Sequence, residues 1–155
     1  MSNEQYMQRA IELAVENVGN GGGPFGAVIV KDGKIIAEGV NRVTSQNDPT
    51  AHAEVQAIRA ACSALHTFDL SGCEIYSSCE PCPMCLGAIY WARLSHLYFA
   101  ATKADAAKAG FDDAFIYKEL PLEIHNRTLP TDTLPLAEAQ EPFEQWLKNA
   151  EKTEY

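Results

Sequence analysis

The sequence lacks an excess of basic residues, a long apolar run and a disulfide pattern. Its 12 Lys and Arg residues face 21 Asp and Glu residues, and the net charge of −9 argues against a fold-wide basic surface for nucleic acid. The longest apolar run, from Leu86 to Ala92, is far shorter than the ~20 residues needed to cross a bilayer. The first residues are neither basic nor apolar, so we expect no signal peptide and a cytoplasmic protein with no membrane and no nucleic-acid partner.

The five cysteines are odd in number, and three of them, Cys79, Cys82 and Cys85, fall within seven positions. Such crowding is a poor framework for disulfides and is typical of a metal-binding cluster in a reducing compartment. Cys62 and Cys73 are interpreted as small buried hydrophobic residues.

Length and composition predict a single folded domain over residues 1–155. The chain is 46% hydrophobic and 21% charged, which argues against intrinsic disorder, and it contains no internal repeat. Segments with strand and helix patterns alternate, which favours an α/β fold with a central mixed β-sheet. Helices are expected over residues 4–18, 51–65 and 83–91, and strands over residues 27–30, 35–40, 73–77 and 97–101.

Two local signals indicate where these elements begin and end. Asp32-Gly33 between two apolar runs predicts a β-hairpin. Asp48 or Thr50 is expected to cap the helix over residues 51–65, with Pro49 in its first turn.

A last helix is expected near residues 136–151. Phe143, Trp146 and Leu147 would share one apolar face that must be buried, either on the chain's own core or on a neighbouring subunit. Pro142 lies inside this run and is expected to split or kink it.

Two short segments, His52-Ala53-Glu54 and Cys79–Cys85, carry the chemistry. Cys82 and Cys85 are three residues apart, so a helical turn would place both sulfurs on one face. Together with one imidazole nitrogen they suit tetrahedral Zn²⁺ and leave its fourth position open. Glu54 would lie beside that position and take a proton from water that zinc activates. The sequence therefore predicts one Zn²⁺ per chain, held by His52, Cys82 and Cys85.

A structural zinc site is the alternative from a different class. With Cys79 as a fourth ligand the site would be closed, and the protein would be a zinc-stabilised interaction module without catalysis. Glu54 argues against this alternative, since a closed site needs no adjacent base. The helix dipole alone also favours a carboxylate in the first turn, so Glu54 could be there without a catalytic role.

The two segments together resemble the zinc site of the cytidine deaminase-like superfamily, H-x-E followed by P-C-x-x-C. From about residue 4 to residue 155 the chain is similar to the bacterial guanine deaminases of that superfamily. The similarity is carried by Gly23–Val30, Asn41, Asp48–Glu54, Gly110–Asp113 and Glu154-Tyr155.

This resemblance implies a three-layer α/β/α sandwich and a zinc hydrolase that converts guanine to xanthine and ammonia in purine catabolism. It also implies a homodimer, with residues 136–155 as a C-terminal segment able to exchange between subunits. Glu54 and Asp113 would be the catalytic residues. The purine base would be bound by Phe25, Asn41, Ala53, Trp91, Asp113 and Tyr155.

Several alternatives stay open. Phe25 and Trp91 fit the core as well as they fit a base pocket, and Asn41 after a strand could simply turn the chain. Asp112 is expected to cap a short helix over residues 114–119, and Asp113 could be that cap instead. A tRNA adenosine deaminase has the same zinc motif, as do other nucleobase and nucleoside deaminases, but the net charge of −9 argues against a tRNA partner.

Overall fold

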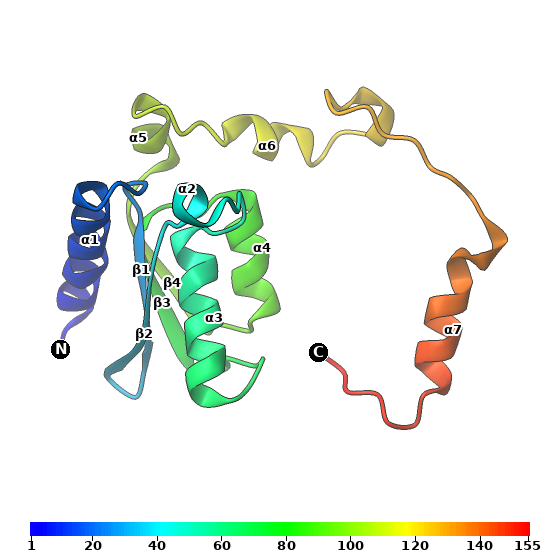
Figure 1. Ribbon diagram of the computed structural model, residues 1–155, viewed down its shortest axis with the longest axis horizontal. Coiled ribbons are helices and arrows are strands. Elements are labelled where there is room, and N and C mark those ends of the chain that lie inside the picture. Colours follow the sequence, from blue (N-terminus) through cyan, green and yellow to red (C-terminus); the bar gives the residue numbers. More distant parts are fainter. The chain divides into compact units, whose positions relative to one another are not determined.

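Four strands form a mixed β-sheet in the order β2-β1-β3-β4, and the computed structural model describes all residues, 1–155 (Figure 1). β1 is antiparallel to both β2 and β3, whereas β3 and β4 are parallel. The mixed sheet expected from the sequence is confirmed. The strands are β1 (Gly26–Lys31), β2 (Lys34–Val40), β3 (Cys73–Cys79) and β4 (His96–Ala101).

Helices cover both faces of this sheet. α1 (Asn3–Gly19) packs on one face, and α3 (Ala53–Leu65) and α4 (Pro83–Trp91) lie on the other (Figure 1). This arrangement confirms the three-layer α/β/α sandwich. The remaining helical segments are α2 (Val43–Gln46), α5 (Lys103–Lys108), α6 (Ala114–Glu119), η1 (Ile124–Asn126), η2 (Ala137–Gln140) and α7 (Glu141–Lys148).

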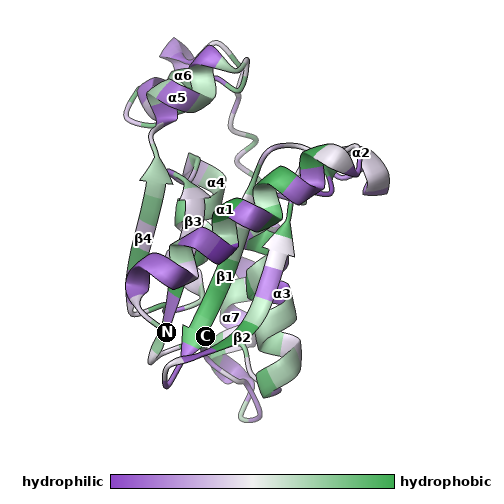
Figure 2. Ribbon diagram, turned by 90° about the vertical axis from the view of Figure 1, so that its left-hand side faces the viewer, coloured by the Kyte–Doolittle hydropathy of each residue, from purple (hydrophilic) through white to green (hydrophobic).

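β1 is buried on both faces because its alternate side chains enter two separate cores. Ala27 and Ile29 pack with α3 and α4, whereas Val28 and Val30 pack with α1. In Figure 2 β1 is therefore green along its length, while α1 alternates between purple and green. No helix of the structure is both long enough and apolar enough to span a bilayer.

The hairpin at Asp32-Gly33 is confirmed. Both residues have positive φ, 50° and 75°, and Lys31 pairs with Lys34 across the turn. Such a two-residue turn matches the twist of the strands that it connects, which explains why Asp-Gly indicates a hairpin.

The predicted N-terminus of the second helix is wrong. α3 begins at Ala53 with His52 as its N-cap, and neither Asp48 nor Thr50 caps it. The Asp48 carboxylate instead accepts hydrogen bonds from the Thr50 backbone N–H at 2.9 Å and from the Thr50 hydroxyl at 2.6 Å. This local turn competes with helix capping, and its result is that His52 lies at the tip of the helix.

The chain forms two compact units, Met1–Ala114 and Phe115–Tyr155. In the second unit η2 ends at Gln140 and α7 begins at Glu141, with Pro142 in its first turn, so Pro142 lies at the expected break. Phe143 and Leu147 are 65% and 72% exposed. The surface that would bury this apolar face of α7 stays a prediction.

Candidate active site

His52, Cys82 and Cys85 converge on one point. The His52 Nδ1 atom lies 3.5 Å from the Cys82 sulfur and 3.4 Å from the Cys85 sulfur. All three potential ligand atoms lie within 4.8 Å of one another. A tetrahedral zinc with bonds of about 2.3 Å to sulfur and about 2.0 Å to nitrogen requires separations of about 3.5 Å between nitrogen and sulfur. The three residues therefore fit zinc and leave its fourth position open.

Two helix N-termini build this cluster. His52 is the N-cap of α3, and Cys82 is the N-cap of α4, with Pro83 in the first turn. The Cys82 sulfur accepts the backbone N–H of Cys85 at 3.5 Å. Because the first N–H groups of a helix lack partners and its dipole is positive at this end, both termini favour negative charge on the sulfurs.

The surroundings of the cluster favour a thiolate at Cys82. A hydrogen bond from the Cys85 thiol lowers the pKa of Cys82 to about 4, against the opposing effect of burial, and His52 lowers it further. The same hydrogen bond raises the pKa of Cys85, and the hydrogen bond with Cys82 raises the pKa of His52. A site that already holds one thiolate is prepared for a divalent soft metal, because the thiolate is the form that binds it.

Glu54 lies next to this cluster but is not part of the metal-binding group. Its side chain is buried, with 6% of the residue exposed, and desolvation is the main reason that its pKa is raised to about 7. A carboxyl group with such a pKa can both take up and release a proton near neutral pH. Glu54 interacts with Cys82 and Cys85, and its role in proton transfer stays a prediction.

Asn41 and Phe25 lie at the same end of the sheet as the tip of α3. Phe25 precedes β1 and Asn41 follows β2, and the Asn41 N–H donates to the Phe25 carbonyl at 3.3 Å. The next residue, Arg42, donates its N–H to Ala51 at 2.9 Å, which joins this turn to the start of α3. Phe111, to which we assigned no role from the sequence, packs edge-on against Phe25 with ring centroids 5.0 Å apart.

The two adjacent aspartates have different surroundings. An Asp112 carboxylate oxygen accepts the backbone N–H of Ala114, the first residue of α6, at 2.9 Å. This bond is a local turn of the kind that Asp48 makes with Thr50, and a capping role for Asp112 stays a prediction. The Oδ1 atom of Asp113 is buried and has no hydrogen-bond partner. Desolvation raises the pKa of Asp113, and the negative charge of Cys82 raises it further. A buried carboxylate oxygen without a partner is a candidate for binding a ligand N–H group.

The other proposed site residues differ in their placement. Ala53 is the fully buried first residue of α3. Trp91 is the last residue of α4 and follows Cys82 by nine residues, which corresponds to about 13 Å along the helix axis at ~1.5 Å per residue. The Trp91 residue is 65% exposed, and the Arg93 guanidinium lies 5.9 Å from the centroid of its ring. Tyr155 belongs to the second unit, where its ring lies 6.5 Å from that of Trp146. Roles for Trp91 and Tyr155 in base binding stay predictions.

Cys79, the fourth ligand in the structural alternative, lies outside the metal-binding group. Its sulfur contacts the Thr102 carbonyl at 3.7 Å, and burial raises the pKa of this thiol to about 11. Because this sulfur lies outside the group in which His52, Cys82 and Cys85 converge, the geometry favours an open zinc site.

The family model for the cytidine and deoxycytidylate deaminase zinc-binding region matches residues 1–101. Guanine deaminase of Bacillus subtilis (strain 168) is 58% identical over 156 residues and 100% of both chains. The X-ray structure of Bacillus subtilis guanine deaminase matches this structure with a TM-score of 0.98 over 100% of this chain and 99% of that one.

More distant relatives share the same fold. A structure of guanine deaminase from Nitrosomonas europaea is 38% identical and has a TM-score of 0.70, over 72% of this chain and 65% of that one. The tRNA-specific adenosine deaminase of Aquifex aeolicus (strain VF5) is 36% identical over 148 residues, which cover 96% of this chain and 95% of that protein.

Proposed function

The chain belongs to the cytidine and deoxycytidylate deaminase zinc-binding family, and we propose that it is a guanine deaminase that uses His52, Cys82 and Cys85 as zinc ligands. The observation that carries this proposal is the 58% identity to a guanine deaminase along the whole chain. The reaction is the hydrolysis of guanine to xanthine and ammonia, and both units, residues 1–155, act as one deaminase domain.

Glu54 is the proton carrier of this proposal. Zinc held by the three ligands supplies Lewis-acid chemistry that lowers the pKa of water to near ~7. The Glu54 carboxylate would take one proton from a water molecule and deliver it to a ring nitrogen, and would then take the second proton of that water and deliver it to the amino group, which leaves as ammonia. The oxygen of water remains on C2 of the base while the bond from C2 to the amino nitrogen breaks, so guanine and water give xanthine and ammonia.

The base is recognised by residues around the cluster. Phe25 supplies an apolar wall, and the Asn41 amide binds the ring edge. Ala53 contributes its backbone N–H, which is among the first four N–H groups of α3 and so lacks an intrahelical partner. Asp113 accepts hydrogen bonds from N1–H and the exocyclic amine of guanine, which are adjacent donors.

Asp113→Asn is expected to lower kcat/KM for guanine about 10- to 100-fold, the value of a hydrogen bond to a charged group. The amide turns one acceptor into a donor that opposes the N–H groups of guanine. The measurement is steady-state formation of xanthine together with the zinc content, which should not change. Asp112→Asn is the matched control, because the amide oxygen of asparagine can accept the same Ala114 N–H. Near-normal guanine turnover in Asp113→Asn would contradict the assignment.

A substrate panel tests the proposed activity itself. Purified zinc-loaded protein is incubated with guanine, guanosine, adenine, adenosine, cytosine, cytidine and tRNA, and the released ammonia is measured. Guanine should be turned over fastest, because a site built around one hydrogen-bonding edge rejects a base without the matching groups by up to ~10⁴–10⁵. Faster turnover of tRNA would support the tRNA adenosine deaminase instead, and no turnover at all would support an interaction module.

The C-terminal segment is proposed to complete the site in a cytoplasmic homodimer that acts in purine catabolism and binds neither nucleic acid nor membrane. The exposed face of α7 with Phe143 and Leu147 needs a surface to cover it, and exchange of residues 136–155 between subunits would supply one. Tyr155 and, from the end of α4, Trp91 would then close the base pocket.

Deletion of Glu154 and Tyr155 tests that placement. KM for guanine should rise or kcat should fall by about tenfold, which corresponds to the loss of ~1.4 kcal/mol of binding. Zinc content should stay unchanged, since no zinc ligand is removed. Glu154→Gln is the control, because it keeps Tyr155 and the chain length. An unaltered kinetic profile after the deletion would count against a role for Tyr155.

A further inference from the structure

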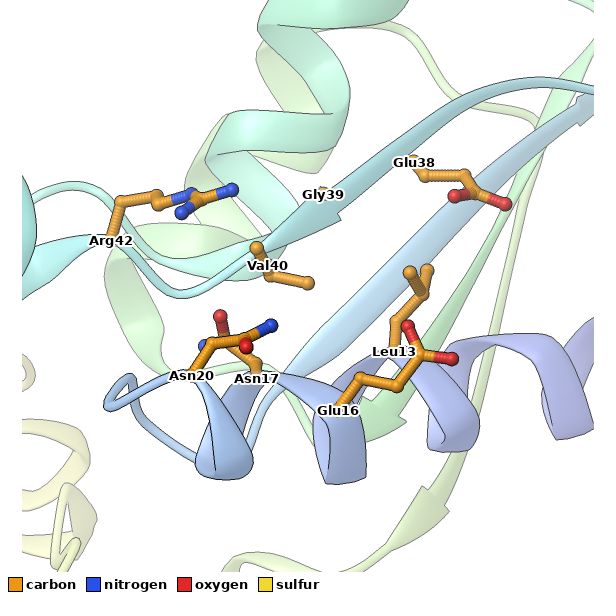
Figure 3. Close-up of a pocket in the computed structure, with 8 residues that line it drawn as sticks. All are labelled: Leu13, Glu16, Asn17, Asn20, Glu38, Gly39, Val40 and Arg42. Atoms are coloured by element: carbon orange, nitrogen blue, oxygen red, sulfur yellow. The ribbon is translucent and has the colours of Figure 1, made fainter.

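Asn17 is a buried polar residue in the last turn of α1, and only 4% of it is exposed. Both hydrogens of its side-chain amide are used: Nδ2 donates to the Gly23 carbonyl at 2.8 Å and to the Asn41 carbonyl at 2.9 Å. Figure 3 shows Asn17 where α1 faces the end of β2, among the residues that line a cleft of about 260 Å³. One amide group therefore connects two segments that are far apart in the sequence.

These two segments are the ones that carry Phe25 and Asn41. The Gly23 carbonyl also accepts the backbone N–H of Phe25 at 2.9 Å. The Phe25 carbonyl in turn accepts the backbone N–H of Asn41 at 3.3 Å. Asn17 thus closes a ring of hydrogen bonds through Gly23, Phe25 and Asn41, although it carries no group that reaches the zinc cluster.

Gly22 and Gly23 lie in close contact with the side chains of Asn17 and Asn41. A Cβ atom at Gly22 would overlap the Asn17 side-chain amide, and the Gly22 N–H donates to the Asn17 carbonyl at 2.8 Å. A Cβ atom at Gly23 would lie 3.1 Å from Cγ of Asn41. The amide groups of Asn17 and Asn41 therefore touch the same two-glycine turn, and a displacement of that turn would shift both.

Asn41 has little other support for its side chain. Its Oδ1 atom accepts the backbone N–H of Val43 at 3.1 Å, which fixes the oxygen end of the amide. With the oxygen fixed, the direction of the NH₂ end depends on the position of the Asn41 backbone, which Asn17 holds through the carbonyl. A shift of the backbone by a few tenths of an ångström would move the donor that binds the base.

We propose that Asn17 is a positioning residue for base recognition, which holds Phe25 and Asn41 in the geometry that binds the purine without touching it. This inference rests on the proposed function, because Asn41 and Phe25 are base-binding residues only there. Since the side-chain hydrogen bonds of Asn17 go to Gly23 and Asn41 and to none of the three metal-binding residues, its loss should act on binding of the base and leave zinc in place.

The test combines Asn17→Ala and Asn17→Asp with Asn41→Ala in double-mutant cycles on guanine deamination. Asn17→Ala removes both donors, and Asn17→Asp replaces them with an acceptor that faces two carbonyl oxygens. Each single Asn17 variant should raise KM roughly tenfold, because two buried carbonyls lose a partner. When Asn41 is already alanine, the Asn17 change should add less than it does in the wild type, since residues of one network are not additive and only the position of Phe25 is then left to disturb. Full additivity of the two effects would overturn the proposal.

Asn20→Asp is the matched control. This variant places the same charge at the same end of α1 as Asn17→Asp does. Asn20 lines the same cleft (Figure 3), but it is exposed, and its side chain has no hydrogen bond to Gly23 or Asn41. Its KM for guanine should equal that of the wild type. An equal change of KM in Asn20→Asp and Asn17→Asp would mean that charge at the helix end, and not positioning, is responsible.

Amide hydrogen exchange separates this proposal from the proposed function. In Asn17→Ala, exchange at the Phe25 and Asn41 N–H groups should be faster than in the wild type, while exchange in β3 stays the same. This readout needs no substrate, so it holds even if the panel identifies another base or no turnover. Unchanged exchange at both groups would overturn the positioning role, whereas faster exchange with no guanine turnover would remove only the guanine assignment.

Discussion

Glu54→Gln should abolish most guanine turnover while zinc stays bound. A general base or acid contributes ~10²–10⁴-fold, and Glu54 is proposed to act in more than one proton transfer, so kcat should fall by at least that factor. Glutamine keeps the size of the buried side chain but cannot carry a proton. Because Glu54 is not part of the metal-binding group, the three ligands remain.

The measurement for this variant is single-turnover formation of xanthine, together with zinc content by mass spectrometry. Glu4→Gln, in the first turn of α1, is the matched control, since it makes the same change at an exposed carboxylate. It should retain wild-type turnover. A Glu54→Gln enzyme within tenfold of the wild type would contradict the assigned role.

Cys85→Ala should lose most of its zinc and, with it, all guanine turnover that depends on the metal. The Cys85 sulfur is fully buried and lies 3.4 Å from Nδ1 of His52, so no water replaces it without a change in the cluster. Removal of a group that only forms a hydrogen bond to a metal ligand lowers the metal affinity about 10- to 100-fold, and removal of a ligand itself should lower it more.

Cys79→Ala is the control, because it makes the same change at another buried cysteine of the motif. Its thiol contacts the Thr102 carbonyl and is not among the potential ligands, so zinc content should stay at one per chain. Zinc retained in Cys85→Ala and lost in Cys79→Ala would reverse the ligand assignment and support a different site.

The parts of the fold that follow local rules could be predicted from the sequence. The turn at Asp32-Gly33 needs only two residues with positive φ between apolar runs. The i, i+3 spacing of Cys82 and Cys85 predicts two of the three metal ligands, and α4 begins and ends where the sequence pattern indicates. These features depend on neighbours in the sequence and not on distant contacts.

The features that could not be predicted depend on contacts between distant segments. The start of α3 depends on the turn of Asp48 with Thr50 and also on the bond from Arg42 to Ala51, which joins the start of α3 to the chain after β2. The role of Asn17 could not be predicted, because its two partners lie 6 and 24 residues away. The one available signal was the glycine-rich stretch 19–23, which begins two residues after Asn17.

The account depends most on the zinc site being open, and X-ray absorption at the zinc edge of the purified protein tests this directly. We predict one zinc per chain with two sulfur ligands, one histidine nitrogen and one oxygen from solvent. The bond lengths should be about 2.3 Å to sulfur and about 2.0 Å to nitrogen. A spectrum with three sulfur ligands and no solvent oxygen would show a closed structural site and would contradict the deaminase mechanism.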